Sequence, residues 1–194
     1  MRPLHVLAAA SLVWLTGCSG EKPNRPASTA PEPAVVYSAN GWSDTERAEY
    51  YHLPEGSELM PYALLANLSS VKTGRPFLEG MDRFGFLPDN AGPTNPYGMP
   101  IGLTVSLSRN TLSKGRQMVG FNCAACHTGQ IAYRGKHLRI DGAPALIDLQ
   151  GYQMDFKASL EAALKDPKKL LALLVALGRD QKAQPPPAAP RSSR

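Results

Sequence analysis

The feature of this sequence that most constrains its fold is the segment Cys123-Ala124-Ala125-Cys126-His127. Two cysteines three residues apart lie on one face of a helix, so both thiols can reach neighbouring vinyl groups on one edge of a porphyrin. His127, four residues after Cys123, can offer an imidazole nitrogen to the iron. The segment therefore predicts one covalently attached haem c, with Cys123 and Cys126 as its thioether partners and His127 as the proximal iron ligand.

Two other kinds of site use a Cys-x-x-Cys pair. A thioredoxin-like dithiol needs a βαβ scaffold, which the sequence pattern does not indicate. A structural zinc site needs four ligands, and the 194-residue chain has no second cysteine pair. The haem interpretation is favoured over both.

The N-terminus has the pattern of an export signal. Arg2 precedes an apolar run over residues 4–15, which is too short to cross a bilayer as a helix. Leu15-Thr16-Gly17-Cys18 follows and resembles the bacterial lipobox, in which the signal is removed before a cysteine that receives lipid. The alternative is an ordinary signal cleaved elsewhere, with Cys18 incidental. We expect a lipoprotein anchored through Cys18 in the cell envelope, facing the periplasm, and Ser19 favours the outer membrane.

These assignments account for all three cysteines of the chain. Cys18 takes the lipid and the other two take the haem, so no disulfide is expected.

The formal charge of +5 is carried mainly by the ends of the chain. Arg2 contributes one unit, and residues 179–194, with four basic side chains and one acidic one, contribute three. Residues 37–178 keep a net charge of about +1, which predicts no basic face of the size that phosphate binding needs. Nucleic acid is therefore excluded as a partner.

Composition divides the chain into four parts. Residues 1–17 form the signal peptide, and residues 18–36, with four prolines, form a disordered tether. Residues 37–178 form the c-type haem domain. Residues 179–194 are rich in proline, serine and arginine and form a disordered tail.

Within the domain, Ser43-Asp44-Thr45-Glu46 fits a capping box that starts a helix ending near His52. Residues 72–102 are dense in glycine and proline and form a long loop of the kind that covers a ligand. The other predicted elements are a helix over 59–68, a helix over 113–125 that delivers the cysteines, a hairpin of 130–133 with 137–140, and helices over 156–165 and 167–177. The expected fold is a mostly α, cytochrome c-like domain with a long Gly/Pro-rich loop and a small β-hairpin.

Several longer motifs surround the cysteine segment. They are Tyr51-His52-Leu53-Pro54-Glu55-Gly56-Ser57, Arg83-Phe84-Gly85-Phe86-Leu87-Pro88-Asp89, Asn95-Pro96-Tyr97-Gly98-Met99-Pro100-Ile101-Gly102, Asn122–Gly129 and Leu138-Arg139-Ile140-Asp141-Gly142-Ala143-Pro144-Ala145. Together they resemble the N-terminal haem domain of bacterial di-haem cytochrome c peroxidase-like proteins, in the branch that contains the haem rubber oxygenases. The resemblance covers a little over half of the chain. Gly115, eight residues before Cys123, also resembles the first helix of many c-type cytochromes, although Val119 stands where an aromatic residue is common.

The chain departs from this family in one respect. Members of the branch are longer and have a second Cys-x-x-Cys-His in a C-terminal domain, whereas this chain has no fourth cysteine. The apolar segment Leu170–Leu177, followed by the Pro/Ser/Arg tail, is consistent with a truncated gene. We expect this segment to pack against a second haem domain supplied by another chain.

The sixth iron ligand determines which function the resemblance implies. Met99, Met154 and His137 are the candidates, and His137 is alternatively a surface residue of the hairpin. A filled sixth position favours an electron-transfer cytochrome with a periplasmic redox partner protein, whereas an open one favours a peroxidase- or oxygenase-like enzyme. Arg139 is predicted to pair with a haem propionate; the alternative is a solvated arginine beside Asp141.

Overall fold

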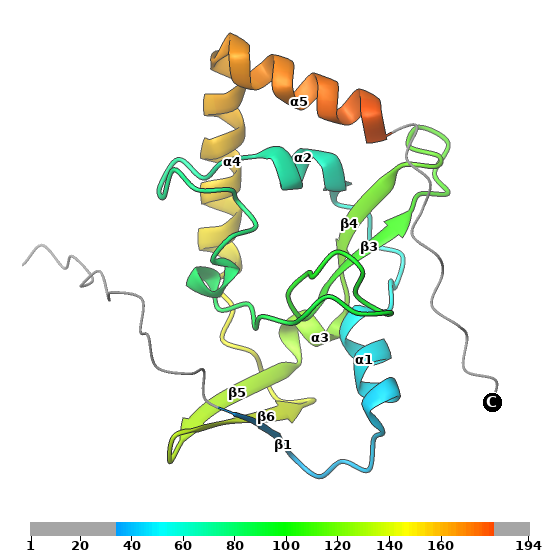
Figure 1. Ribbon diagram of the computed structural model, residues 1–194, viewed down its shortest axis with the longest axis vertical. Coiled ribbons are helices and arrows are strands. Elements are labelled where there is room, and N and C mark those ends of the chain that lie inside the picture. Colours follow the sequence, from blue (N-terminus) through cyan, green and yellow to red (C-terminus); the bar gives the residue numbers. More distant parts are fainter. Residues whose placement is uncertain (1–33, 181–194) are drawn as a thin grey trace, which may run out of the picture. The chain divides into compact units, whose positions relative to one another are not determined.

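The computed structural model describes residues 34–180. Its strands are β1 (Val35–Tyr37), β2 (Met60–Pro61), β3 (Leu103–Leu107), β4 (Gln117–Phe121), β5 (Thr128–Tyr133) and β6 (Lys136–Asp141). Its helices are α1 (Asp44–His52), α2 (Tyr62–Asn67), the 3-10 helix η1 (Met81–Phe84), α3 (Cys123–Cys126), α4 (Leu149–Lys165) and α5 (Pro167–Asp180). Figure 1 shows β1, β5 and β6 at one end, α5 at the other, and α3 between them.

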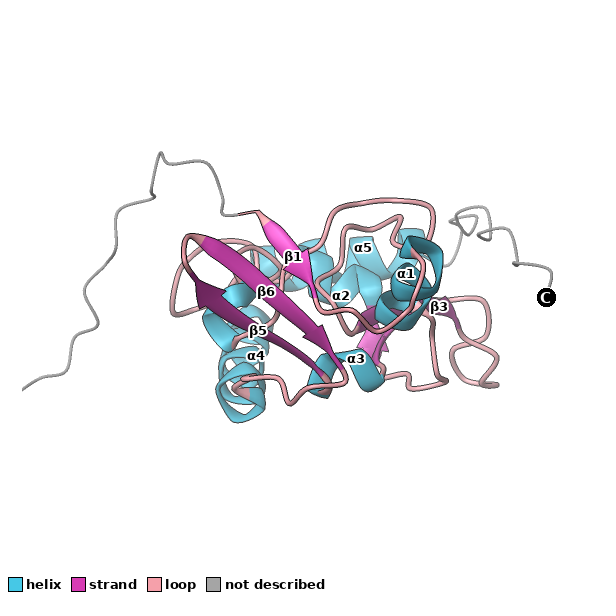
Figure 2. Ribbon diagram, turned by 90° about the horizontal axis from the view of Figure 1, so that it is seen from below, coloured by secondary structure: helices cyan, strands magenta, loops and turns pink. Residues whose placement is uncertain are grey.

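The described residues form a mixed fold with two small sheets, so the prediction of a mostly α, cytochrome c-like domain is wrong. One sheet has the strand order β1-β6-β5 and the other has the order β2-β4-β3. The helices pack beside these sheets rather than forming a bundle around the cysteine segment (Figure 2).

The error is largest before the cysteines, where a helix was expected over residues 113–125. Residues 117–121 form β4 instead, with Val119 paired to Val105 on one side and to Met60 on the other. Gly115 lies in the preceding turn at φ +78° and does not belong to a helix. Strand pairing with partners 10–18 residues away in β3 and 57–59 residues away in β2 decides this conformation, and such pairing leaves only a weak local signal.

The predicted hairpin is confirmed, with β5 and β6 antiparallel and joined at Arg134 and Gly135. Arg134 is the one non-glycine residue with positive φ among residues 34–180. β1 adds to this hairpin in parallel, pairing Val35 with His137. The domain thus begins two residues inside the expected tether.

The predicted capping box is also confirmed. The Ser43 hydroxyl accepts a hydrogen bond from the Glu46 amide, and the Glu46 carboxylate accepts one from the Ser43 amide. α1 then ends at His52, as expected, with Leu53 as its C-cap. A capping box depends only on residues within one turn of the helix start, so the sequence predicts it well.

The predicted long loop contains η1 and otherwise no regular element between residues 77 and 102. It is held by side chains that bond to its own backbone. The Asn95 amide group donates to the carbonyl of Met99 and accepts from its amide, and the Arg83 guanidinium donates to the carbonyl of Glu79. These bonds replace the regular pairing that the loop lacks.

The main core packs aromatic rings around Tyr152 of α4. Its ring lies within about 6 Å of five phenylalanine rings: Phe77, Phe84, Phe86, Phe121 and Phe156. These rings come from the long loop, from β4 and from α4 itself, so the core joins the loop to the C-terminal helices.

The two C-terminal helices extend beyond their predicted bounds. α4 begins at Leu149 because Asp148 caps it, its carboxylate accepting a hydrogen bond from the Gly151 amide. α5 begins at Pro167, as expected, and continues past Gly178 to Asp180. Within residues 34–180, no helix is both long enough and apolar enough to cross a membrane.

Candidate haem-attachment site

Helix α3 brings Cys123, Cys126 and His127 to the surface together. All three side chains are exposed, whereas Ala124 and Ala125 between the cysteines are buried. Asn122 caps the helix and also donates hydrogen bonds to the carbonyls of Tyr50 and Leu53, which fixes α3 against the end of α1. A four-residue helix with its small residues inward thus presents both thiols and the imidazole outward.

The buried side of α3 rests on Gly102. This glycine has φ +84°, and a Cβ built on it would lie 2.2 Å from the Cα of Ala125. The Gly102 carbonyl also accepts a hydrogen bond from the Asn122 amide at 3.0 Å. The end of the Gly/Pro-rich loop therefore supports the cysteine helix directly. A residue larger than glycine at position 102 would leave no room for α3.

The turn after β6 holds the other side of α3. The Gly142 amide donates to the carbonyl of His127 at 2.7 Å, and the Ala145 amide donates to the carbonyl of Cys126 at 2.9 Å. The Tyr50 hydroxyl donates to the same His127 carbonyl at 2.8 Å. These bonds place the 141–145 segment beside the backbone of His127.

A buried carboxylate holds this turn in place. Asp141 accepts hydrogen bonds from the Tyr51 hydroxyl at 2.5 Å and from Arg47 Nε at 3.0 Å, both from α1. Burial, together with the Asp141 carboxylate, raises the pKa of Tyr51 above its usual range, so the tyrosine stays a donor at neutral pH. Asp141 thereby ties α1 to the segment that supports His127.

The Cys123 thiol has an acidic neighbour. Its Sγ lies 3.1 Å from Oε2 of Glu55. The hydrogen bond and the negative charge of Glu55 raise the pKa of the Cys123 thiol. Glu55 therefore makes the Cys123 thiol harder to deprotonate.

The surroundings of α3 fit an attached haem. Leu53, whose carbonyl bonds to Asn122, is 60% exposed, and Leu146, directly after the residue bonded to Cys126, is 88% exposed. Trp42, which is 39% exposed, packs edge-on against Tyr50 at 5.0 Å. Large apolar side chains on both flanks of two exposed thiols are what a porphyrin would cover. Among residues 34–180, no three His, Cys, Asp or Glu side chains are grouped so as to hold a bare metal ion.

The structure separates the three candidate sixth ligands. Met99 is buried in the main core, whereas Ala124 of α3 packs in a smaller cluster with Tyr51 and Ile101. Met154 is exposed on α4, and His137 is half-buried in β6 opposite Ala132.

Arg139 is not the solvated arginine of the alternative interpretation. It is buried, and its guanidinium donates two hydrogen bonds to Oε1 of Gln130, at 2.8 and 3.1 Å. Its pairing with a haem propionate stays a prediction. Cys18 lies outside the described residues, as do the signal peptide and most of the tether and tail.

Sequence reasoning missed several residues that build this site. Gly102, Glu55 and Tyr50 had no assigned role, although the first two lie in motifs quoted for the family resemblance. Only a fold that brings residues 50–55, 102 and 142–145 around α3 reveals their part.

Comparison with known proteins adds one relative. The chain is 34% identical over 134 residues to an uncharacterized protein, y4iJ, of Sinorhizobium fredii. The match takes in 59% of this chain but only 22% of that protein, so the chain spans about a fifth of its relative's length. No protein-family profile and no solved structure matches the chain.

Proposed function

We propose that the protein is a c-type cytochrome that binds one haem covalently and transfers electrons in the cell envelope. The observation that carries this proposal is the joint exposure of Cys123, Cys126 and His127 on one side of α3, with the alanines between them buried. A bound haem would supply a one-electron iron couple, and the protein would set its position and its potential.

Each side chain of α3 has a defined task in this proposal. Cys123 and Cys126 would hold the haem, each through a thioether bond in which the thiol adds across one vinyl group, so no oxidant would be needed. His127 would hold the iron through one ring nitrogen. The bonds from Tyr50 and Gly142 to the His127 carbonyl limit movement of that residue. Leu53 and Leu146 would exclude water from the bound group.

Localisation belongs to the same proposal. A lipid on Cys18 would anchor the protein at the membrane, facing the periplasm, where cytochrome maturation and redox partner proteins operate. The lipobox is the support for this part of the proposal.

The test is expression in a host competent in cytochrome maturation. We expect a red product whose colour stays with the protein in acidified acetone, and a haemochrome spectrum typical of two thioether bonds. Cys123→Ala should shift that spectrum toward one thioether bond, and the double variant with Cys126→Ala should lose covalent haem. A colourless wild-type product from this host would refute the proposal.

A peroxidase- or oxygenase-like activity is the second candidate. The packing of Met99 in the main core favours it, because that methionine is then less free to reach the iron. Rapid binding of cyanide or carbon monoxide would support an open sixth position, and refusal of both would support electron transfer.

A further inference from the structure

The charges of residues 34–180 are unevenly distributed. These residues include 15 basic and 14 acidic side chains. Two segments, residues 108–116 and 167–179, hold six of the basic side chains and none of the acidic ones. The remainder is therefore acidic, with nine basic side chains against 14 acidic ones. The expectation of no basic face, which rested on the small net charge of the domain, therefore fails for these two segments.

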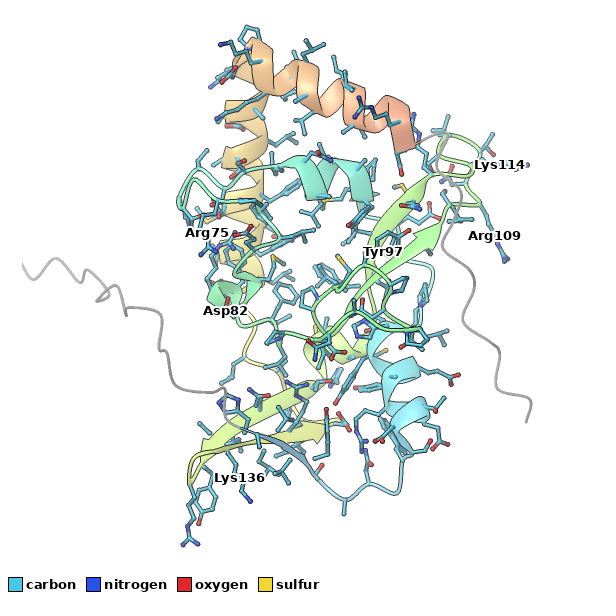
Figure 3. The ribbon with its side chains drawn as sticks, viewed as in Figure 1. Arg75, Asp82, Tyr97, Arg109, Lys114 and Lys136 are labelled. Atoms are coloured by element: carbon cyan, nitrogen blue, oxygen red, sulfur yellow. The ribbon has the colours of Figure 1, made fainter. Side chains whose placement is uncertain are left out.

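Both segments lie at the same end of the domain. Residues 108–116 join β3 to β4, and Asp180 at the end of α5 bonds to the backbone of Gln117 at the start of β4. Figure 3 shows Arg109 and Lys114 projecting from this loop beside the end of α5, and Lys136 at the opposite end of the molecule. The loop and the end of α5 therefore lie together, whereas Lys168 and Lys169 stand roughly 17 Å away at the start of the helix. We call the loop and α5 together the basic end.

The basic end also exposes apolar side chains. Leu112, at the tip of the loop, is 94% exposed, and Leu171 on α5 is 62% exposed. Leu174 and Val175 are exposed as well, three and four residues after Leu171, so they form one stripe on the helix. The opposite side of α5, including Leu173, packs on α2 and α4. The exposed stripe thus faces away from the core.

Basic side chains border these apolar ones. Arg109 and Lys114 stand on either side of Leu112 in the sequence, and Lys168 and Arg179 flank the stripe along α5. The acidic residue of α5, Asp180, is buried, and its carboxylate lies close enough to Arg116 to offset part of that charge. On α4, the Glu161 carboxylate lies 3.8 Å from the ammonium of Lys157.

We propose that the basic end is a membrane-binding surface that takes anionic lipid headgroups. Apolar side chains bordered by lysine and arginine are the composition that binds the interface of an anionic bilayer. The acids beside them, Glu58 and Asp166, are half-buried and accept hydrogen bonds from the Ser108 hydroxyl and the Lys168 amide. A protein partner would need acidic and polar groups at fixed positions opposite these side chains. A lipid bilayer needs only anionic headgroups and an apolar layer beneath them. This inference does not depend on haem attachment.

The test uses the chain from residue 19 onward, so that neither the signal peptide nor a lipid is attached, and with Trp42→Phe. Single tryptophans are placed by Leu171→Trp, Leu112→Trp or Ile131→Trp, the last on the exposed hairpin far from α5. With vesicles of brominated phosphatidylcholine and about one-third phosphatidylglycerol, we expect quenching at positions 171 and 112 and none at 131.

Charge variants give an independent measurement. Lys168→Gln with Lys169→Gln should weaken partition onto these vesicles roughly 25-fold at low salt, because each lost charge weakens it about fivefold. The matched control, Arg134→Gln with Lys136→Gln at the hairpin turn, should change partition less than about twofold. The proposal would be overturned if the two pairs of charge variants had equal effects, or if position 131 were quenched as strongly as position 171. It would also be overturned if the protein self-associated and buried position 171 in the absence of vesicles. Binding of position 171 to a second haem domain with no partition onto vesicles would overturn it as well.

Discussion

Replacement of Gly102 by alanine tests how the cysteine helix is held. Gly102 has φ +84°, which costs a non-glycine residue about 1–2 kcal/mol. The new Cβ would also lie 2.2 Å from the backbone nitrogen of Ala125, well inside the ~3.5 Å of an ordinary contact. α3 must then move outward by more than about 1 Å.

That movement has a cost that the structure allows us to work out. It breaks the hydrogen bond from the Asn122 amide to the Gly102 carbonyl, worth about 1 kcal/mol. It also loosens the packing of buried Ala124 and Ala125, worth about another 1 kcal/mol. With the cost of the positive φ, Gly102→Ala should lower the free energy of unfolding by about 3–4 kcal/mol.

Gly115→Ala is the matched control, because Gly115 has φ +78° and nothing within 4 Å of a built Cβ. It should cost only about 1–2 kcal/mol. Urea unfolding of the haem-free proteins, followed by circular dichroism, measures both values, and the yield of covalent haem reports the position of α3. If the two variants lose equal stability and attach haem equally well, close packing against Gly102 does not position α3.

Three further changes test the supports of the site and of the fold. Asp141→Asn should cost about 3 kcal/mol in urea unfolding, because it removes the buried carboxylate beside Arg47 and leaves only the exposed Asp44 at 3.4 Å; a loss below about 1 kcal/mol would contradict this. Ser43→Ala should lower the melting temperature by an amount equivalent to about 1 kcal/mol by removing the cap of α1, whereas an unchanged melting temperature would show that the capping box adds nothing. Burial raises the pKa of Asp180 above 3.8, so the folded state binds more protons than the unfolded one as pH rises from that value, and stability falls over this range. Asp180→Asn should therefore remove this fall and raise stability at pH 7, which thermal melts at several pH values would check.

The sequence by itself determined the features that depend on near neighbours. The spacing of Cys123, Cys126 and His127 defines the chemistry proposed for the chain. The capping box of α1 and the hairpin of β5 with β6 were predicted correctly, because both are set by contacts within about ten residues.

The tertiary structure decided what depends on distant pairing. Residues 117–121 became a strand because β2 and β3 lie on both sides of it, and no local pattern marked that. Gly102, Glu55 and Tyr50 came to the cysteine helix from segments up to 77 residues away. The basic end likewise arises only when residues 108–116 meet α5. The net charge of the chain does not reveal it, because acidic side chains elsewhere balance the basic ones that folding brings together.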